Sequence, residues 1–173
     1  MVCISKSFKS IAAGFALTIP IGASLLTGNV SAQPARSLAS GSLCMAGETP
    51  IFSCPLGIKQ AAVCGSGKQA IYRYGRPGKI EMASRSMMLA KQGFSGGGET
   101  QIQVTNKDYM YVLFDKTTRT GFGADSHNDP ESRSGLLVRR GGRTLLSKEC
   151  SDDAPIPSRA ANFMPADGKV VAH

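Results

Sequence analysis

Short runs of β-forming residues, separated by turn-forming residues, are the feature that most constrains how this chain can fold. In chain order the runs are Ile51–Cys54, Lys59–Cys64, Gln69–Tyr74, Lys79–Met82, Thr100–Thr105, Tyr109–Phe114, Leu136–Arg140 and Arg143–Ser147. No long amphipathic helix interrupts them, and 20 glycines and 9 prolines supply the turns between them. Short strands at this spacing predict an all-β fold, a small antiparallel β-sandwich or barrel.

Two places along the chain show how clear this pattern is. Ile102 and Val104 alternate with polar neighbours, which is typical of a half-buried strand. Gly141-Gly142 offers the positive φ angles that a two-residue hairpin turn requires. Only Ser84–Gln92 is ambiguous, since its apolar run is too short to separate a strand from a short helix.

The first 32 residues have the three parts of an export signal. Lys6 and Lys9 give a positive start, an apolar run follows from Ile11 to Leu26, and Val30-Ser31-Ala32 places small residues before a cut after Ala32. A membrane anchor is the alternative, but the apolar run is short for a span of about 20 residues. We therefore expect cleavage, no membrane insertion afterwards, and a periplasmic or extracellular location.

Four cysteines remain after cleavage: Cys44, Cys54, Cys64 and Cys150. An even set in an exported chain predicts two disulfides. A four-cysteine zinc site would need close pairs two to four residues apart, which this chain lacks. Three connectivities are open, and a hairpin around Pro55–Ile58 favours Cys44–Cys64 with Cys54–Cys150, because Cys64 would then lie at the open end near Cys44.

Length and charge suggest one basic domain. We predict a flexible leader at 33–43, a disulfide-linked β domain at 44–150 and a flexible C-terminal tail at 151–173. Loss of Lys6 and Lys9 leaves 18 basic against 12 acidic residues, a net charge of +6. Such an excess favours an anionic envelope polymer or an acidic protein as partner. Nucleic acid is not expected for an exported chain, and we expect a monomer.

A resemblance supports one secreted domain. The segments Phe52-Ser53-Cys54, Tyr72–Met82 (YRYGRPGKIEM) and Phe94–Gly98 (FSGGG), followed by a closing GLLVRRGGR and a cysteine, resemble a group of small exported proteobacterial proteins. That group has no assigned activity. The resemblance spans about Cys44 to Cys150 and implies no catalytic residue.

Two basic segments are candidate binding surfaces. On a strand, Tyr72 and Tyr74 share one face and Arg73 the other, and Arg76 and Lys79 flank a Pro-Gly turn. Tyrosine and arginine are enriched at binding hot spots, although these tyrosines could equally pack inside. A second basic tip comprises Arg139, Arg140 and Arg143 around the Gly-Gly turn. The two tips would form an anion-binding face if the fold grouped them.

Evidence for catalysis is weak. Gly93–Gly97 matches G-x-S-x-G around Ser95, but that motif requires a strand, a turn and a helix, and here a strand follows. His127 lies in a polar loop without an identifiable nucleophile, and the loop lacks the spacing of a calcium site. We expect no metal, no cofactor and no enzyme activity.

These observations predict an exported non-enzymatic binding module. One form of it is an inhibitor of an envelope-directed hydrolase. The alternatives are a structural component that binds anionic envelope polymers, and a small envelope hydrolase that uses Ser95 or His127.

Overall fold

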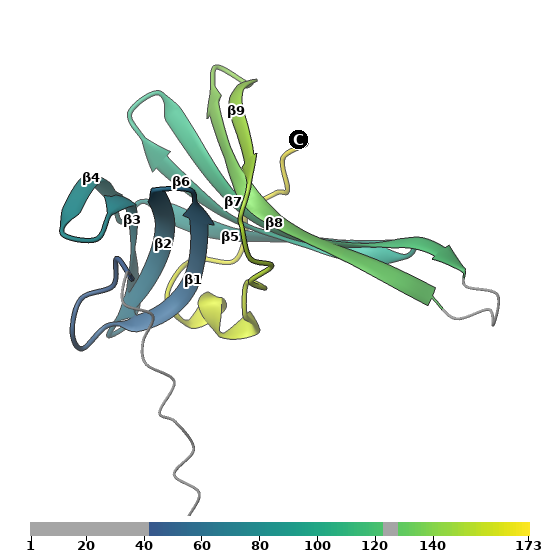
Figure 1. The fold of residues 1–173 in the computed structure, drawn as a ribbon, viewed down its shortest axis with the longest axis horizontal. Coiled ribbons are helices and arrows are strands. Elements are labelled where there is room, and N and C mark those ends of the chain that lie inside the picture. Colours follow the sequence, from purple (N-terminus) through teal and green to yellow (C-terminus); the bar gives the residue numbers. More distant parts are fainter. Residues whose placement is uncertain (1–41, 123–127) are drawn as a thin grey trace, which may run out of the picture. The chain divides into compact units, whose positions relative to one another are not determined.

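The structure, a computed structural model, describes residues 42–122 and 128–173. Two antiparallel sheets make up most of this part of the chain. The first sheet contains β1 (Thr49–Leu56), β2 (Lys59–Ser66), β3 (Gln69–Arg76) and β4 (Lys79–Ser84), and the second contains β5 (Met87–Phe94), β6 (Gly97–Asn106), β7 (Tyr109–Phe122), β8 (Asn128–Arg140) and β9 (Arg143–Glu149). In each sheet the strands follow chain order (Figure 1). The predicted all-β fold is confirmed. The expected export signal and His127 lie outside the described residues.

The strands lie where the sequence pattern predicted them, but their lengths differ from the predicted ones. The ambiguous segment Ser84–Gln92 contributes strand β5 rather than a helix. Strands β7 and β8, of 14 and 13 residues, extend well past the apolar runs that predicted them (Figure 1). Their added residues are mostly polar, so no alternation of apolar and polar residues marks these parts of the strands in the sequence.

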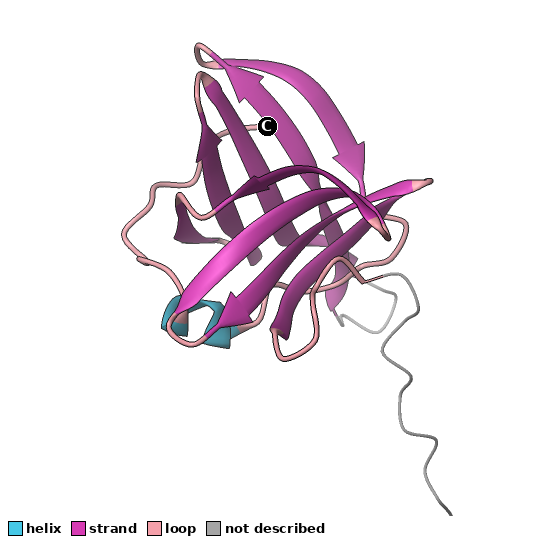
Figure 2. Cartoon of the chain, turned by 90° about the vertical axis from the view of Figure 1, so that its left-hand side faces the viewer, coloured by secondary structure: helices cyan, strands magenta, loops and turns pink. Residues whose placement is uncertain are grey.

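The core lies between the inner faces of the two sheets. Its buried residues come from both sheets: Ile51, Val63 and Tyr72 from the first, and Leu89, Ile102, Leu113 and Leu136 from the second. Each of these side chains is at most 3% exposed, as expected for two sheets packed as a sandwich. Figure 2 shows strands throughout, and the 3-10 helix η1 (Ser158–Asn162) is the one helix among the described residues.

The predicted disulfides are confirmed. Cys44–Cys64 fastens the segment before β1 to the outer face of the first sheet, where Leu43 packs with Ala62. Leu43 is only 4% exposed, which corrects the expectation of a flexible leader at this residue. Residues 33–41 of that leader lie outside the described residues.

Cys54–Cys150 joins β1 of the first sheet to the residue that follows β9 of the second. This bridge spans a sequence separation of 96 residues. It therefore ties together the two layers of the sandwich.

The C-terminal residues are not the loose tail that the sequence analysis predicted for 151–173. Ile156, Ala160 and Met164 enter the core, with exposed fractions of 6%, 0% and 7%. After Pro165 the chain runs along the second sheet, where Gly168 forms a parallel bridge with Ala90. Apolar residues scattered among Pro, Ala and charged residues give no periodic signal, so only the packed structure reveals their burial.

Candidate functional site

Tyr72 and Arg73, the first residues of the predicted binding segment, are structural. Tyr72 is fully buried, and its ring centroid lies 5.9 Å from that of Tyr111. Burial raises the pKa of its hydroxyl far above the ordinary value. Arg73, on the other face of β3, is 4% exposed and donates to both carboxylate oxygens of Glu48, at 2.5 and 2.8 Å, and to the carbonyl of Leu43.

The rest of that segment stays nearer the surface. Tyr74 is half-buried, with Lys59 Nζ 5.4 Å from its ring centroid. Lys59 also forms an ion pair with Glu81 at 2.6 Å. Arg76 and Lys79 are exposed at the turn between β3 and β4. Of the predicted binding residues, Arg76 and Lys79 are therefore the exposed ones.

Two residues of the second basic tip, Arg139 and Arg140, line a hollow of about 320 Å³. Two turns build it, the one between β6 and β7 and the one between β8 and β9. They lie together because alternate turns of an antiparallel meander share one end of the sheet, and the register pairs Tyr109 with Arg140 and Met110 with Arg139. Its lining residues are Thr105, Lys107, Asp108, Tyr109, Met110, Arg139, Arg140, Gly141, Gly142 and Val171.

Cations outnumber anions in this hollow by three to one, with Lys107, Arg139 and Arg140 against Asp108. The Arg140 guanidinium lies 5.1 Å from the ring centroid of Tyr109, and its Nη2 is 3.4 Å from Asp108 Oδ2. Arg140 is therefore held at the rim by a cation–π contact and a loose, exposed ion pair.

Arg139 is positioned more tightly than Arg140. Its Nη2 donates to the carbonyl of Gly142 at 2.7 Å. Its Nε is buried and has no hydrogen-bond partner among the described residues. Gly141 and Gly142, with φ of 56° and 79°, form the tight turn that brings this carbonyl back over β8. A buried guanidinium N–H without an acceptor is costly.

Part of this site was predicted from the sequence. Arg139 and Arg140 of the predicted second basic tip line the hollow, whereas Arg143 is exposed but is not among the lining residues. Lys107 and Tyr109 were not predicted as site residues. The signal was present, since a meander that contains both turns predicts that they share one end of the sheet.

The remaining candidates have structural explanations. Ser95 lies in the turn between β5 and β6, and a strand follows it rather than the helix that a nucleophile elbow requires. Cys44, Glu48 and Cys64 are the one group of metal-ligand types close together in the described part of the chain. Both sulfurs form a disulfide, and Glu48 is paired with Arg73, so this group is not a metal site.

Two disulfides indicate an oxidising, non-cytoplasmic environment. Within residues 42–122 and 128–173 we find no helix long and apolar enough to cross a bilayer. Comparisons with protein-family models, curated proteins and solved structures gave no significant match.

Proposed function

We propose that this protein is an exported, non-enzymatic binding module of the periplasm or extracellular space. Its ligand is an anionic group of an envelope polymer, bound in the hollow between the β6–β7 and β8–β9 turns. The observation that carries this proposal is the excess of positive charge in this hollow, which is lined by three cations, Lys107, Arg139 and Arg140, and one carboxylate, that of Asp108.

The chemistry of the hollow suits a carboxylate or a phosphate. A guanidinium presents several N–H donors in one plane, and these match two oxygens of such an anion. Contact with Tyr109 restricts the motion of Arg140, so less side-chain freedom is lost when a ligand binds. Met110 and Val171 add apolar surface for the uncharged part of a polymer unit.

The net charge of the whole chain supports the same ligand class. The formal charge is +8 for the full sequence, and +6 if the predicted export signal is removed. A positive molecule attracts polyanions at long range, and this steering weakens as salt rises. The hollow would then supply the short-range contacts that persist in salt.

Calorimetric titration with a defined polyphosphate and a defined polyuronate tests the proposal. We expect the double variant Arg139→Gln/Arg140→Gln to bind at least about tenfold more weakly, a change of about 1.4 kcal/mol. The matched control is Arg76→Gln/Lys79→Gln, which removes the same charge from the exposed β3–β4 turn and should change the affinity less than about threefold.

The salt dependence of binding distinguishes a specific anion site from diffuse electrostatic attraction. The difference between the two double variants should persist at about 0.15 M salt, where exposed charges farther apart than about 8 Å are largely screened. Equal losses in both variants would show that only net charge matters. Absence of binding to either polymer would also contradict the proposal.

A further inference from the structure

Strand β6 carries a row of buried polar side chains on the outer face of the second sheet. Glu99, Gln101 and Gln103 alternate along the strand and therefore share one face. Their exposed fractions are 7%, 0% and 5%. Buried amides and carboxylates normally have hydrogen-bond partners. The partners of this row therefore indicate what this face of the sheet can bind.

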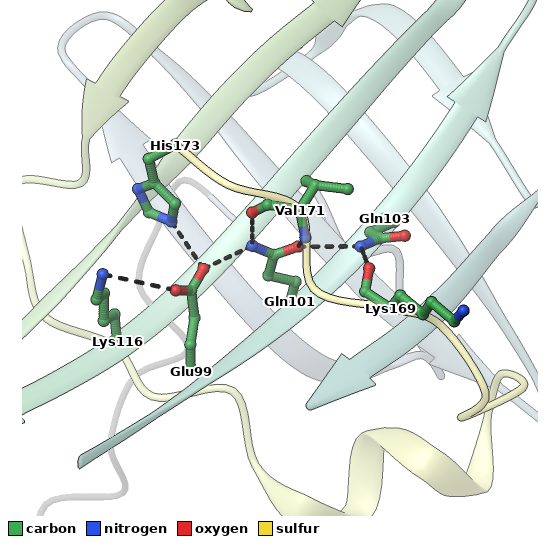
Figure 3. A network of polar contacts seen from close by, with 7 residues as sticks. All are labelled: Glu99, Gln101, Gln103, Lys116, Lys169, Val171 and His173. Carbon is green, nitrogen blue, oxygen red and sulfur yellow. Dashed lines mark hydrogen bonds and ion pairs between the residues drawn. The ribbon is translucent and has the colours of Figure 1, made fainter. Parts of the chain in front are cut away.

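The partner of the row is the backbone of the C-terminal segment Gly168–His173 (Figure 3). Gln101 Nε2 donates to the carbonyl of Val171 at 2.8 Å, and Gln101 Oε1 accepts from the N–H of Val171 at 3.0 Å. Gln103 Nε2 donates to the carbonyl of Lys169 at 2.6 Å. The two-bond contact with Val171 resembles the pairing between residues of adjacent antiparallel strands.

Contacts within the row hold these amides in place. Gln101 Nε2 also donates to Glu99 Oε1 at 2.5 Å, and Gln103 Nε2 donates to Gln101 Oε1 at 3.0 Å. Glu99 Oε1 is 2.7 Å from His173 Nε2, and Glu99 Oε2 is 3.8 Å from Lys116 Nζ (Figure 3). The row is therefore oriented in part by contacts between its own side chains, and not by the segment alone.

Three positions of the segment also contact the sheet in ways that favour particular kinds of side chain. A Cβ at Gly168 would lie 3.0 Å from the carbonyl oxygen of Leu89, a tight contact that favours a small residue there. Val171 packs on the buried outer-face cluster of Val112, Phe114 and Leu137. His173 contacts the Phe114 ring edge-on at 4.3 Å and faces Glu99. The face thus fits a small residue, then an aliphatic one, then a basic one.

The segment does not fill the face on which it lies. The 320 Å³ hollow lies to one side of Val171, and a second hollow of about 450 Å³ adjoins the segment near Phe94 and Lys116. Lys169, Ala172 and His173 are exposed, and no residue of the segment belongs to the core between the sheets. The segment is therefore held less firmly than the sheets beneath it.

We infer that the outer face of the second sheet is a preformed groove for an extended peptide of another protein, and that Gly168–His173 is its built-in occupant. The partner peptide has a small residue, an aliphatic residue three positions later and a basic residue two positions after that. It binds by displacing the segment. This inference goes beyond the proposed anion site, with which it shares Val171, and it rests on Gln101 and Gln103, which do not line the anion hollow.

Fluorescence anisotropy with a labelled peptide of sequence GKVVAH tests the inference on the full-length oxidised protein. The variant Val171→Asp weakens the built-in occupant, so it should bind the peptide at least about tenfold more tightly than the unaltered protein does. Adding Gln101→Leu to this variant should reverse the gain. A peptide carrying the Val171→Asp change should not bind measurably.

The control separates the two proposals. Arg139→Gln/Arg140→Gln, placed in the Val171→Asp protein, should leave peptide binding within about threefold, even if the anion site fails. Absence of saturable binding to a Val171→Asp protein whose near-ultraviolet circular dichroism matches the unaltered protein would overturn the inference. A dimer of the unaltered protein in light scattering that Gln101→Leu dissociates would make a second copy the occupant, and would also overturn it.

Should Val171→Asp disturb the fold, truncation after Asp167 provides an independent variant, since the removed residues are absent from the core. The same outcomes apply to it.

Discussion

Arg73 illustrates at the scale of one residue how burial changes the role of a charge. Its guanidinium is enclosed on the outer face of the first sheet, because residues 43–48 cover that face and Cys44–Cys64 fastens them there. Glu48 and the Leu43 carbonyl accept its hydrogen bonds. A buried pair of this kind contributes little when intact but leaves an uncompensated charge when one partner is removed.

Replacement of Arg73 therefore tests its structural role. We expect Arg73→Met to lower the free energy of unfolding by about 2–3 kcal/mol, because Glu48 and the Leu43 carbonyl lose their donor. The exposed neighbour Arg76→Met should stay within about 0.5 kcal/mol. Urea unfolding measures both, and equal effects would mean that the contacts of Arg73 with Glu48 and Leu43 do not stabilise the fold.

The same pair has a pH signature. The hydrogen bonds from Arg73 hold the pKa of Glu48 below its ordinary value. Its contribution to stability is therefore present above the unfolded pKa of about 4.3 and is lost as pH falls through the lower folded pKa. As pH falls below about 4.3, the unfolding free energies of the unaltered protein and Arg73→Met should converge, and parallel curves would contradict this.

At the scale of an element, β8 shows why some strand positions accept only glycine. Gly135 pairs with Glu149 on one side and with Phe114 on the other. A Cβ at Gly135 would lie 2.5 Å from the carbonyl oxygen of Lys148 and 2.5 Å from the ring of Phe114. The close approach of β8 to β9 thus depends on the missing side chain.

A pair of alanine substitutions tests this packing. Gly135→Ala should destabilise the protein by about 2 kcal/mol or more, because backbone and a buried ring must both shift. Gly93→Ala in β5 is the matched control, since a Cβ there meets nothing within 4 Å. Thermal unfolding followed by circular dichroism compares them, and a similar melting temperature for both variants would refute the argument.

At the scale of the whole molecule, the two disulfides differ in the sequence separation of the cysteines that they join. Cys44–Cys64 closes a separation of 20 residues and holds one segment on one sheet. Cys54–Cys150 closes a separation of 96 residues and joins the two sheets. In the chain-entropy account the longer loop restricts the unfolded chain more, so the second bridge should stabilise the protein more.

Removal of each bridge by paired alanine substitutions gives the corresponding prediction. Loss of Cys54–Cys150 should cost about 4–5 kcal/mol, and loss of Cys44–Cys64 about 3 kcal/mol. Denaturant unfolding of the two double variants ranks them. The reverse ranking would mean that enclosure of Arg73 by the first bridge outweighs chain entropy.

The sequence alone determined the features that depend on local chemistry. Glycine turns and alternating apolar residues such as Ile102 and Val104 predicted the strands, and the even cysteine set with the Pro55–Ile58 hairpin predicted both bridges. Tertiary structure decided what depends on contacts between distant residues. Arg73 is buried because residues 43–48 fold over it, and residues 168–173 lie on the second sheet because glutamines about 70 positions earlier bind their backbone. No local pattern encodes such contacts, because each side chain gains its partner only when the sheets assemble.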